Sequence, residues 1–110
     1  MTGYYELKRS GATGYMFNLK AGNHETILTS QIYTDKNGAH TGIASVQTNS
    51  PHEKQFDRKV AKDGSPYFVL TAANNEVIGT SEMYSSTSAR DQGIGSVRAN
   101  GPSTTIKDID

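Results

Sequence analysis

Two stretches of the chain decide the fold: Tyr15 to Pro51, YMFNLKAGNHETILTSQIYTDKNGAHTGIASVQTNSP, and Pro66 to Pro102, PYFVLTAANNEVIGTSEMYSSTSARDQGIGSVRANGP. When they are aligned without a gap, at a shift of 51 residues, 15 of the 37 pairs are identical. Random composition would give about two or three matches, so the repeat indicates one supersecondary unit written twice. A unit of about 50 residues is too small to bury its own apolar faces. We therefore expect a single domain over residues 1–110, in which two copies, about 1–51 and 52–110, share one core.

The first half of each copy has the alternation of half-buried strands. Phe17 and Leu19 fall on one face of their stretch, as Phe68 and Leu70 do in the second copy. The turns Gly22–His24 and Ala73–Asn75 are typical of hairpins, because asparagine tolerates positive φ and bonds its own backbone. Short strands are expected at Tyr4–Lys8, Tyr15–Lys20, Ile27–Thr29, Phe56–Val60, Tyr67–Ala72 and Val77–Thr80.

The second half of each copy changes to helical spacing after Tyr33 and Tyr84. Oxygen-bearing side chains suited to an N-cap precede both helices, at Thr34 or Asp35 and at Ser85 or Ser86. Both helices should stop at an asparagine that is followed by Ser-Pro or Gly-Pro, where Asn49, Asn100 and Gly101 could take a left-handed cap.

Glycine recurs inside each expected helix, at Gly42 and Gly93. Such a glycine costs about 0.5–1 kcal/mol relative to alanine. We expect it to permit a close approach of the helix backbone to the sheet. The last segment, Ser103–Lys107, is competent to form a further strand. The order of elements is therefore β-β-β-α-β-β-β-α-β, an α+β fold with mostly antiparallel strands and both helices on one face.

Two motifs resemble the YegP-like family of small bacterial proteins of uncharacterised function. They are the strand-turn-strand Phe17–Ile27 and the helix Gly42–Asn49, and both recur in the second copy, as Phe68–Ile78 and Gly93–Asn100. The second helix departs from the first at Gly95, which stands where the first copy has Ala44. The resemblance implies two β3-α-β units in one sheet with exchange of the C-terminal strand. It also implies a monomer that mimics a dimer of single repeats, and it brings no activity or cofactor.

Composition excludes several classes of function. The chain has no cysteine, which rules out disulfides and thiolate chemistry. Lys+Arg and Asp+Glu each count 11, so a strongly basic nucleic-acid binder or a polybasic membrane module is not expected. No run of apolar residues approaches the length of roughly 18 residues that a helix needs to span a bilayer. Glu6, Lys8 and Arg9 stand where a signal peptide needs apolar residues, so we expect a cytoplasmic protein.

The residue types that carry chemistry form no recognised constellation. His24, His40 and His52 lack a metal-ligand spacing, and the serines lack a nucleophile pattern. Glu25 and Glu76 follow the hairpin turns, where a carboxylate can accept backbone N–H bonds. Tyr33 and Tyr84 close each strand-to-helix junction, with burial as the expected role and ligand stacking as the alternative. We expect no catalytic residue, no metal and no cofactor.

The sheet face away from the helices is the candidate interaction face. It should carry Tyr4 or Tyr5, Met16, Asn18, Lys20, Tyr67, Val69 and Thr71. Aromatic and cationic groups on a sheet can bind a protein partner or, weakly, a single-stranded nucleic acid. We therefore expect a small non-enzymatic binding or protein-interaction module. The alternative is a purely structural or dimerising protein without a small ligand, which would leave this face an ordinary half-exposed surface.

The shared core leads to a test of cooperativity. Unfolding of the whole chain in urea should be a single two-state transition despite the duplication. A fragment that ends at Asn49 should be unfolded or dimeric, because one copy cannot cover its own sheet. Dispersed NMR shifts together with monomeric sedimentation of that fragment would contradict a shared core.

Overall fold

The computed structural model describes residues 3–109, and the order of its elements is the one expected. The elements are β1 (Tyr4–Ser10), β2 (Gly14–Lys20), β3 (Thr26–Ser30), α1 (Lys36–Asn49), the 3-10 helix η1 (Glu53–Gln55), β4 (Phe56–Val60), β5 (Pro66–Thr71), β6 (Val77–Thr80), α2 (Thr87–Asn100) and β7 (Ile106–Asp108). The α+β class and the tandem arrangement are confirmed.

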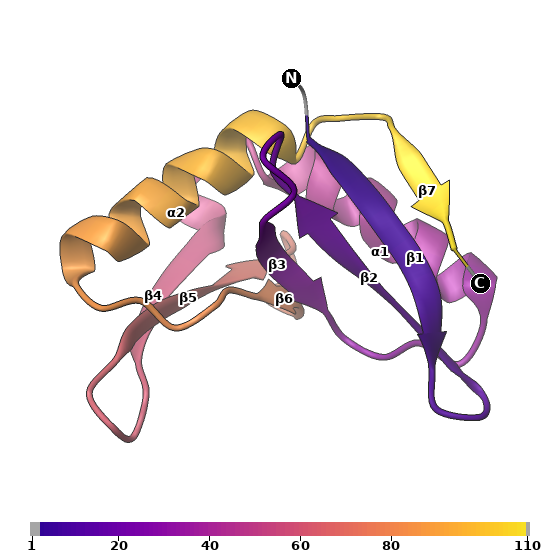
Figure 1. Cartoon of the computed structure of the whole chain (residues 1–110), viewed down its shortest axis with the longest axis horizontal. Helices are drawn as coiled ribbons and strands as arrows, with labels where there is room; N and C mark the ends of the chain where they lie inside the picture. Colours follow the sequence, from indigo (N-terminus) through magenta and orange to yellow (C-terminus); the bar gives the residue numbers. More distant parts are fainter. Residues whose placement is uncertain (1–2, 110) are drawn as a thin grey trace.

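All seven strands form one sheet in the order β4-β5-β6-β3-β2-β1-β7 (Figure 1). The two copies meet where β3 pairs antiparallel with β6, and Thr29 lies opposite Thr80. These two threonines are equivalent positions of the repeat, so a pseudo-two-fold axis passes between them. At one edge β7 runs parallel to β1, with Tyr5 opposite Ile106. The expected exchange of the C-terminal strand is thus confirmed there.

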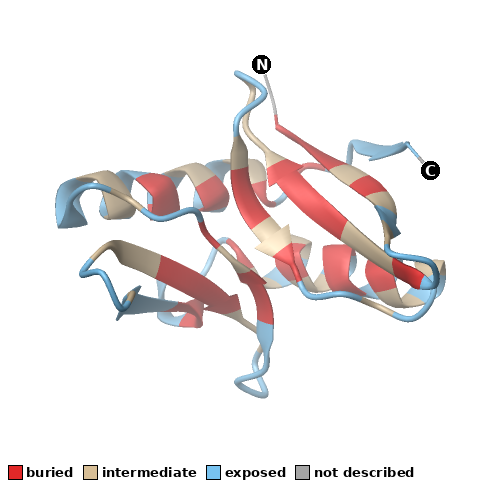
Figure 2. Cartoon of the chain, turned by 60° about the horizontal axis from the view of Figure 1, so that its bottom comes forward, coloured by how far each residue is buried: buried red, intermediate tan, exposed pale blue. Residues whose placement is uncertain are grey.

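Both helices lie on one face of the sheet, and each crosses from its own copy to the other. Helix α1 packs against β2 and also against β5 and β6, while α2 packs against β5 and also against β2 and β3. The buried side chains form one cluster with members from both copies, including Phe17, Leu19, Phe68 and Leu70. Figure 2 shows buried residues along the central strands and on one side of each helix. The register of the strands therefore turns the predicted apolar face toward the helices.

The local signals at the helix ends and turns are partly corrected. Asp35 and Ser86 are the N-caps, each accepting from a backbone N–H three residues on. The residues that follow the helices, Ser50 and Gly101, have φ of −60° and −56°, so the expected left-handed caps are wrong. Positive φ occurs instead in the hairpin turns, at His24 and Asn75, one residue after the asparagines whose side chains accept the turn hydrogen bonds.

Near the pseudo-two-fold axis, large and small residues at equivalent positions face each other. A Cβ on Gly79 would lie 2.8 Å from Cγ of Leu28, and these two residues are counterparts in the repeat. A Cβ on Gly101 would overlap the side chain of Ser50, which is also its counterpart. In both pairs a side chain of the first copy fills the space that a glycine of the second copy leaves.

The glycines inside the helices admit a tyrosine ring rather than the sheet backbone. A Cβ on Gly42 would lie 2.7 Å from Tyr33 Cζ, closer still to its hydroxyl, and 3.0 Å from Phe17. A Cβ on Gly93 would lie 2.5 Å from Tyr84 Cζ. The expectation of a close approach is therefore right about the crowding and wrong about the neighbour.

These contacts predict opposite effects for two alanine substitutions in α2. Gly93→Ala should lower the free energy of unfolding by about 1–3 kcal/mol, because the new methyl group overlaps the Tyr84 ring. Gly95→Ala, where no atom lies within 4 Å of the added Cβ, should raise it by about 0.5–1 kcal/mol through helix propensity. Urea melts of both variants measure the difference. Stabilisation by Gly93→Ala would contradict the packing of Tyr84 against α2.

Candidate functional site

A crevice of about 470 Å³ lies between α1 and the turn that joins β5 to β6. Its walls come from different copies: α1 and the segment before it belong to the first, and the β5–β6 hairpin belongs to the second. The lining residues are Gln31, Tyr33, Gly38, Thr41, Gly42, Ser45, Ala72, Asn74, Glu76, Val77 and Ile78. Its volume falls in the range of small-ligand sites, about 300–1,000 Å³.

Tyr33 forms the wall on the side of α1. Its backbone is held by two hydrogen bonds with Tyr15, of 2.7 and 2.8 Å, and its ring is stacked on Phe17 with centroids 6.2 Å apart. Because Gly42 has no side chain, the ring can lie directly against the helix. Burial raises the pKa of the Tyr33 hydroxyl, so this group stays a protonated hydrogen-bond donor at neutral pH.

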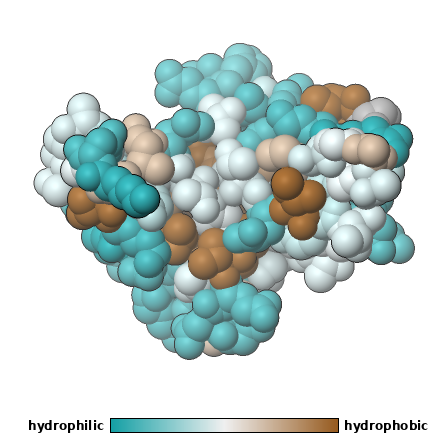
Figure 3. Space-filling model, turned by 90° about the horizontal axis from the view of Figure 1, so that it is seen from below, coloured by the Kyte–Doolittle hydropathy of each residue, from teal (hydrophilic) through white to brown (hydrophobic). Residues whose placement is uncertain are grey.

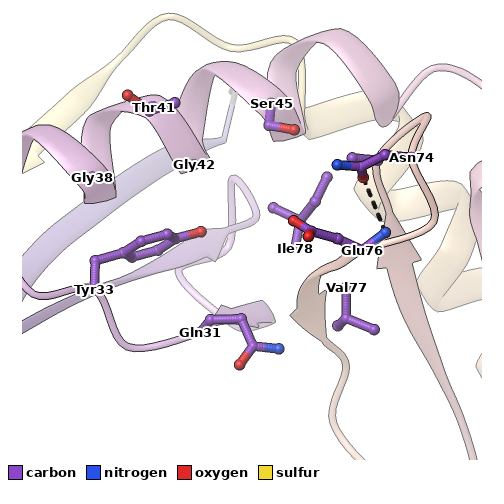
Figure 4. A pocket seen from close by; sticks show the side chains of 11 residues that line it. Gln31, Tyr33, Gly38, Thr41, Gly42, Ser45, Asn74, Glu76, Val77 and Ile78 are labelled. Atoms are coloured by element: carbon purple, nitrogen blue, oxygen red, sulfur yellow. Dashed lines mark hydrogen bonds between the residues drawn. The ribbon is translucent and has the colours of Figure 1, made fainter.

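Glu76 stands on the opposite wall, at the end of the hairpin turn. Its backbone N–H donates to Asn74 Oδ1 at 3.1 Å, and its carbonyl accepts from Ala72 at 2.9 Å. The carboxylate is exposed and has no hydrogen-bond or ion-pair partner within residues 3–109, so the expectation that it accepts N–H bonds from the turn is wrong. Figure 4 shows the carboxylate and the Tyr33 hydroxyl pointing toward one another across the crevice.

The repeat keeps most of this lining in both copies. Seven of the eleven lining residues have an identical counterpart, a higher share than the 15 of 37 pairs over the whole alignment. Packing and turn geometry account for Gly42, Ile78 and Asn74. They do not account for the exposed Glu76 carboxylate or for a tyrosine hydroxyl at both junctions. These two groups are the features of the repeat that point to a ligand.

The equivalent groups of the repeat lie near Tyr84. The ring of Tyr84 is stacked on that of Phe68, with centroids 6.2 Å apart. The residue equivalent to Glu76 in the repeat is Glu25, on the β2–β3 turn. Burial, with the charges of Glu82 and Glu25 adding to it, raises the pKa of Tyr84. Tyr84 therefore lies within electrostatic reach of the hairpin glutamate of the first copy.

The histidines lie apart from the crevice. His24 lies in the β2–β3 turn, with its Nδ1 2.9 Å from the hydroxyl of Tyr4, while His40 and His52 are exposed. Among residues 3–109, no three His, Cys, Asp or Glu side chains are grouped in a way that could hold a metal ion. In the crevice, Ser45 Oγ is 3.3 Å from Asn49 Nδ2, a group that cannot act as a base.

The candidate interaction face has less accessible surface than its sequence suggests. Tyr4 and Val69 are only 6% and 5% exposed, and the Lys107 ammonium covers the Tyr4 ring at 4.3 Å. Tyr5 lies in the core, and Met16, Lys20 and Tyr67 are half-buried.

The lysines of this face lie beside carboxylates. Lys20 Nζ is 3.9 Å from Glu6, and Lys59 Nζ is 3.4 Å from Asp57. Seen from the side away from α2, hydrophobic residues stand in separate groups among hydrophilic ones (Figure 3). Pairing of the cations lowers the attraction of this face for phosphates.

Sequence reasoning named both members of the crevice pair but not their meeting. Glu25, Glu76, Tyr33 and Tyr84 are all identical across the repeat, which was the available signal. The pairing of Tyr33 with Glu76 crosses between copies, and it follows only from the way α1 lies over β5 and β6.

The fold and the paired walls define a class: a two-repeat α+β protein with one sheet and helices that cross between the repeats. The profile of the family described as "Domain of unknown function (DUF1508)" matches residues 11–57 and again residues 61–108. The chain belongs to this family. A UPF0339 protein of Shewanella oneidensis is 60% identical over 109 residues, covering 99% of both chains.

Solved structures agree with this assignment. The solution NMR structure of the Shewanella oneidensis UPF0339 protein matches with a TM-score of 0.92, covering 99% of this chain and 92% of that one. The solution NMR structure of yegP from E. coli, at 51% identity, matches with a TM-score of 0.93, covering 99% of this chain and 94% of that one. The names of these relatives assign them no function, and nothing among the matches suggests catalysis. Over residues 3–109, neither helix has the length and apolar character needed to cross a membrane.

The charge environment of Tyr84 provides a test of the crossed arrangement. Glu25→Gln should lower the pKa of Tyr84, because it removes one of the negative charges that oppose ionisation of the hydroxyl. The pKa of Tyr33 should stay unchanged. Titration of the tyrosine ring ¹³C shifts with pH measures both, with Glu76→Gln as the matched control that leaves Tyr84 unaffected. An unchanged pKa of Tyr84 in the Glu25→Gln variant would contradict the proximity of Tyr84 to the β2–β3 turn.

Proposed function

We propose that the protein is a non-enzymatic binding module whose crevice holds the cationic side chain of a lysine or arginine from a protein partner. The observation that carries the proposal is the Glu76 carboxylate, which faces the Tyr33 hydroxyl without a cation beside it among the described residues. A carboxylate next to an aromatic wall suits a side chain that has an apolar stem and a charged head.

The remaining lining fits the same ligand. Val77 and Ile78 offer an apolar surface for the stem, and the amide side chain of Gln31 is also part of the lining. Glu25 of the first copy and Glu82 of the second both lie near Tyr84, so the equivalent position there is also acidic. A carboxylate and a tyrosine hydroxyl thus come together at two places, each between the two copies. A module that presents the same pair twice could engage two basic residues of one partner.

Other functions have less support. Nucleophilic or metal-assisted catalysis has little support, because the crevice is lined by neither histidine nor cysteine. Binding of single-stranded nucleic acid to the sheet face is weakened by the carboxylates beside Lys20 and Lys59. A purely structural role leaves the repeated carboxylate of Glu76 without a reason.

Titration with short peptides tests the proposal. Acetyl-Gly-Lys-Gly-amide, added to the ¹⁵N-labelled chain, should shift the amide signals of Tyr33, Ser45 and Glu76 in a saturable way. Glu76→Gln should weaken this binding roughly three- to fivefold, the range expected for one partly exposed ion pair. The same peptide with norleucine in place of lysine should lose binding to a similar degree.

Glu25→Gln is the matched control, since it makes the same change on the equivalent turn of the other copy. It should leave the titration at Tyr33 and Glu76 unchanged and affect only the signals near Tyr84. Equal shifts with the lysine and norleucine peptides would overturn the proposal, as would shifts confined to the sheet face.

A further inference from the structure

The edge of the sheet at β1 shows how this fold accepts an added strand. There β7 runs parallel to β1, the Tyr5 N–H donates to the Thr105 carbonyl at 2.9 Å, and the Ile109 N–H donates to the Leu7 carbonyl at 3.0 Å. Figure 1 shows the two strands side by side, although they come from opposite ends of the chain. The outward groups of Tyr5 and Leu7 are thereby satisfied.

Strand β4 is the counterpart of β1 in the second copy, and it forms the other edge of the sheet. Phe56 pairs with Leu70 as Tyr5 pairs with Leu19, so the register of the two hairpins is the same. Within residues 3–109 no strand lies beyond β4. The segment that follows α1 forms η1 and then enters β4 itself, so it cannot lie alongside that strand.

The backbone of β4 offers hydrogen-bonding groups at this edge. Phe68 lies opposite Arg58. Its N–H donates to Ser81 Oγ and its carbonyl accepts from the Ser81 N–H, so both groups point away from β4. The N–H and carbonyl of Arg58 therefore point outward, as those of Leu7 do. The Phe56 N–H is already taken by the Glu53 carbonyl of η1. An added strand would consequently be anchored at Arg58, and its far end would reach the exposed Val60.

The side chains at this edge select the strand that fits. In the β1 template the residues Ile106, Lys107 and Asp108 lie opposite Tyr5, Glu6 and Leu7. The equivalent positions of β4 are Phe56, Asp57 and Arg58. An apolar–basic–acidic sequence would thus place its apolar residue beside Phe56, its cation beside Asp57 and its carboxylate beside Arg58.

The charged groups of Arg58 and Asp57 remain exposed to solvent, although both have ion-pair partners. Arg58 is paired with Glu53 at 2.8 Å and with Asp91 at 3.1 Å, and Asp57 with Lys59 at 3.4 Å, all among exposed side chains. Edge strands with free backbone groups are templates for strand addition. We infer that the β4 edge binds an extended segment of a partner protein with an apolar–basic–acidic sequence, added as a parallel strand.

A peptide copied from residues 104–109, acetyl-Thr-Thr-Ile-Lys-Asp-Ile-amide, is the probe for this edge. Added to the ¹⁵N-labelled full chain, it should shift the signals of Phe56–Val60 in a saturable way and leave those of β1 unchanged. The charge-swapped peptide, with Glu-Lys in place of Lys-Asp, should bind at least fivefold more weakly. N-methylation of the last isoleucine, whose N–H would donate to the Arg58 carbonyl, should reduce binding by a similar factor.

Arg58→Glu should reverse the preference between the two peptides. Lys62→Glu, which makes the same change of charge in the exposed β4–β5 turn, should not. Absence of shifts at β4 would overturn the inference, as would an N-methylated or charge-swapped peptide that binds as tightly as the original peptide. Shifts at β1 and β7 would do the same, since they would mean exchange with the chain's own strand. Shifts at β4 that depend on protein concentration without peptide would assign the edge to a second copy instead of a separate partner.

Discussion

The short antiparallel pairing of β3 with β6 is the contact on which the rest of the structure depends. It joins two three-stranded hairpin arrays that could not cover themselves, and it sets Thr29 against its own counterpart Thr80. Once this register is set, the pseudo-two-fold axis is defined. Each helix then lies over strands of both copies. One continuous core follows from a seam of only a few residues.

The same crossing creates the crevice. A tyrosine at the start of a helix in one copy is brought opposite a glutamate on the hairpin of the other, so neither copy contains a complete site. Gly42 and Gly93 serve this arrangement, since they let the hydroxyl ends of Tyr33 and Tyr84 lie directly against the helices. Glycine lowers the stability of each helix slightly, but it leaves the room that the tyrosine hydroxyl occupies. Packing and recognition are thus linked through one glycine in each copy.

Much of the fold was predictable from the sequence because its signals are local and occur twice. Alternation placed Phe17, Leu19, Phe68 and Leu70 in the core, and oxygen-bearing residues before each helix included the caps Asp35 and Ser86.

Three features depend on neighbours that no local pattern reveals. The helix ends keep right-handed φ at Ser50 and Gly101, where the two copies pack closely against each other. Tyr4 and Val69 are buried although alternation assigns them to the exposed face. The meeting of Tyr33 with Glu76 requires knowledge of how the copies are joined.

The pairs Leu28–Gly79 and Ser50–Gly101 have a further consequence for the history of such chains. An assembly of two identical subunits must set a residue against itself at its symmetry axis, so that a large side chain there would collide with its own image. Fusion of two copies removes that restriction: one copy can supply the protruding group and the other the hollow. Once this has happened, neither position can drift without the other, and the two halves of the chain are no longer interchangeable.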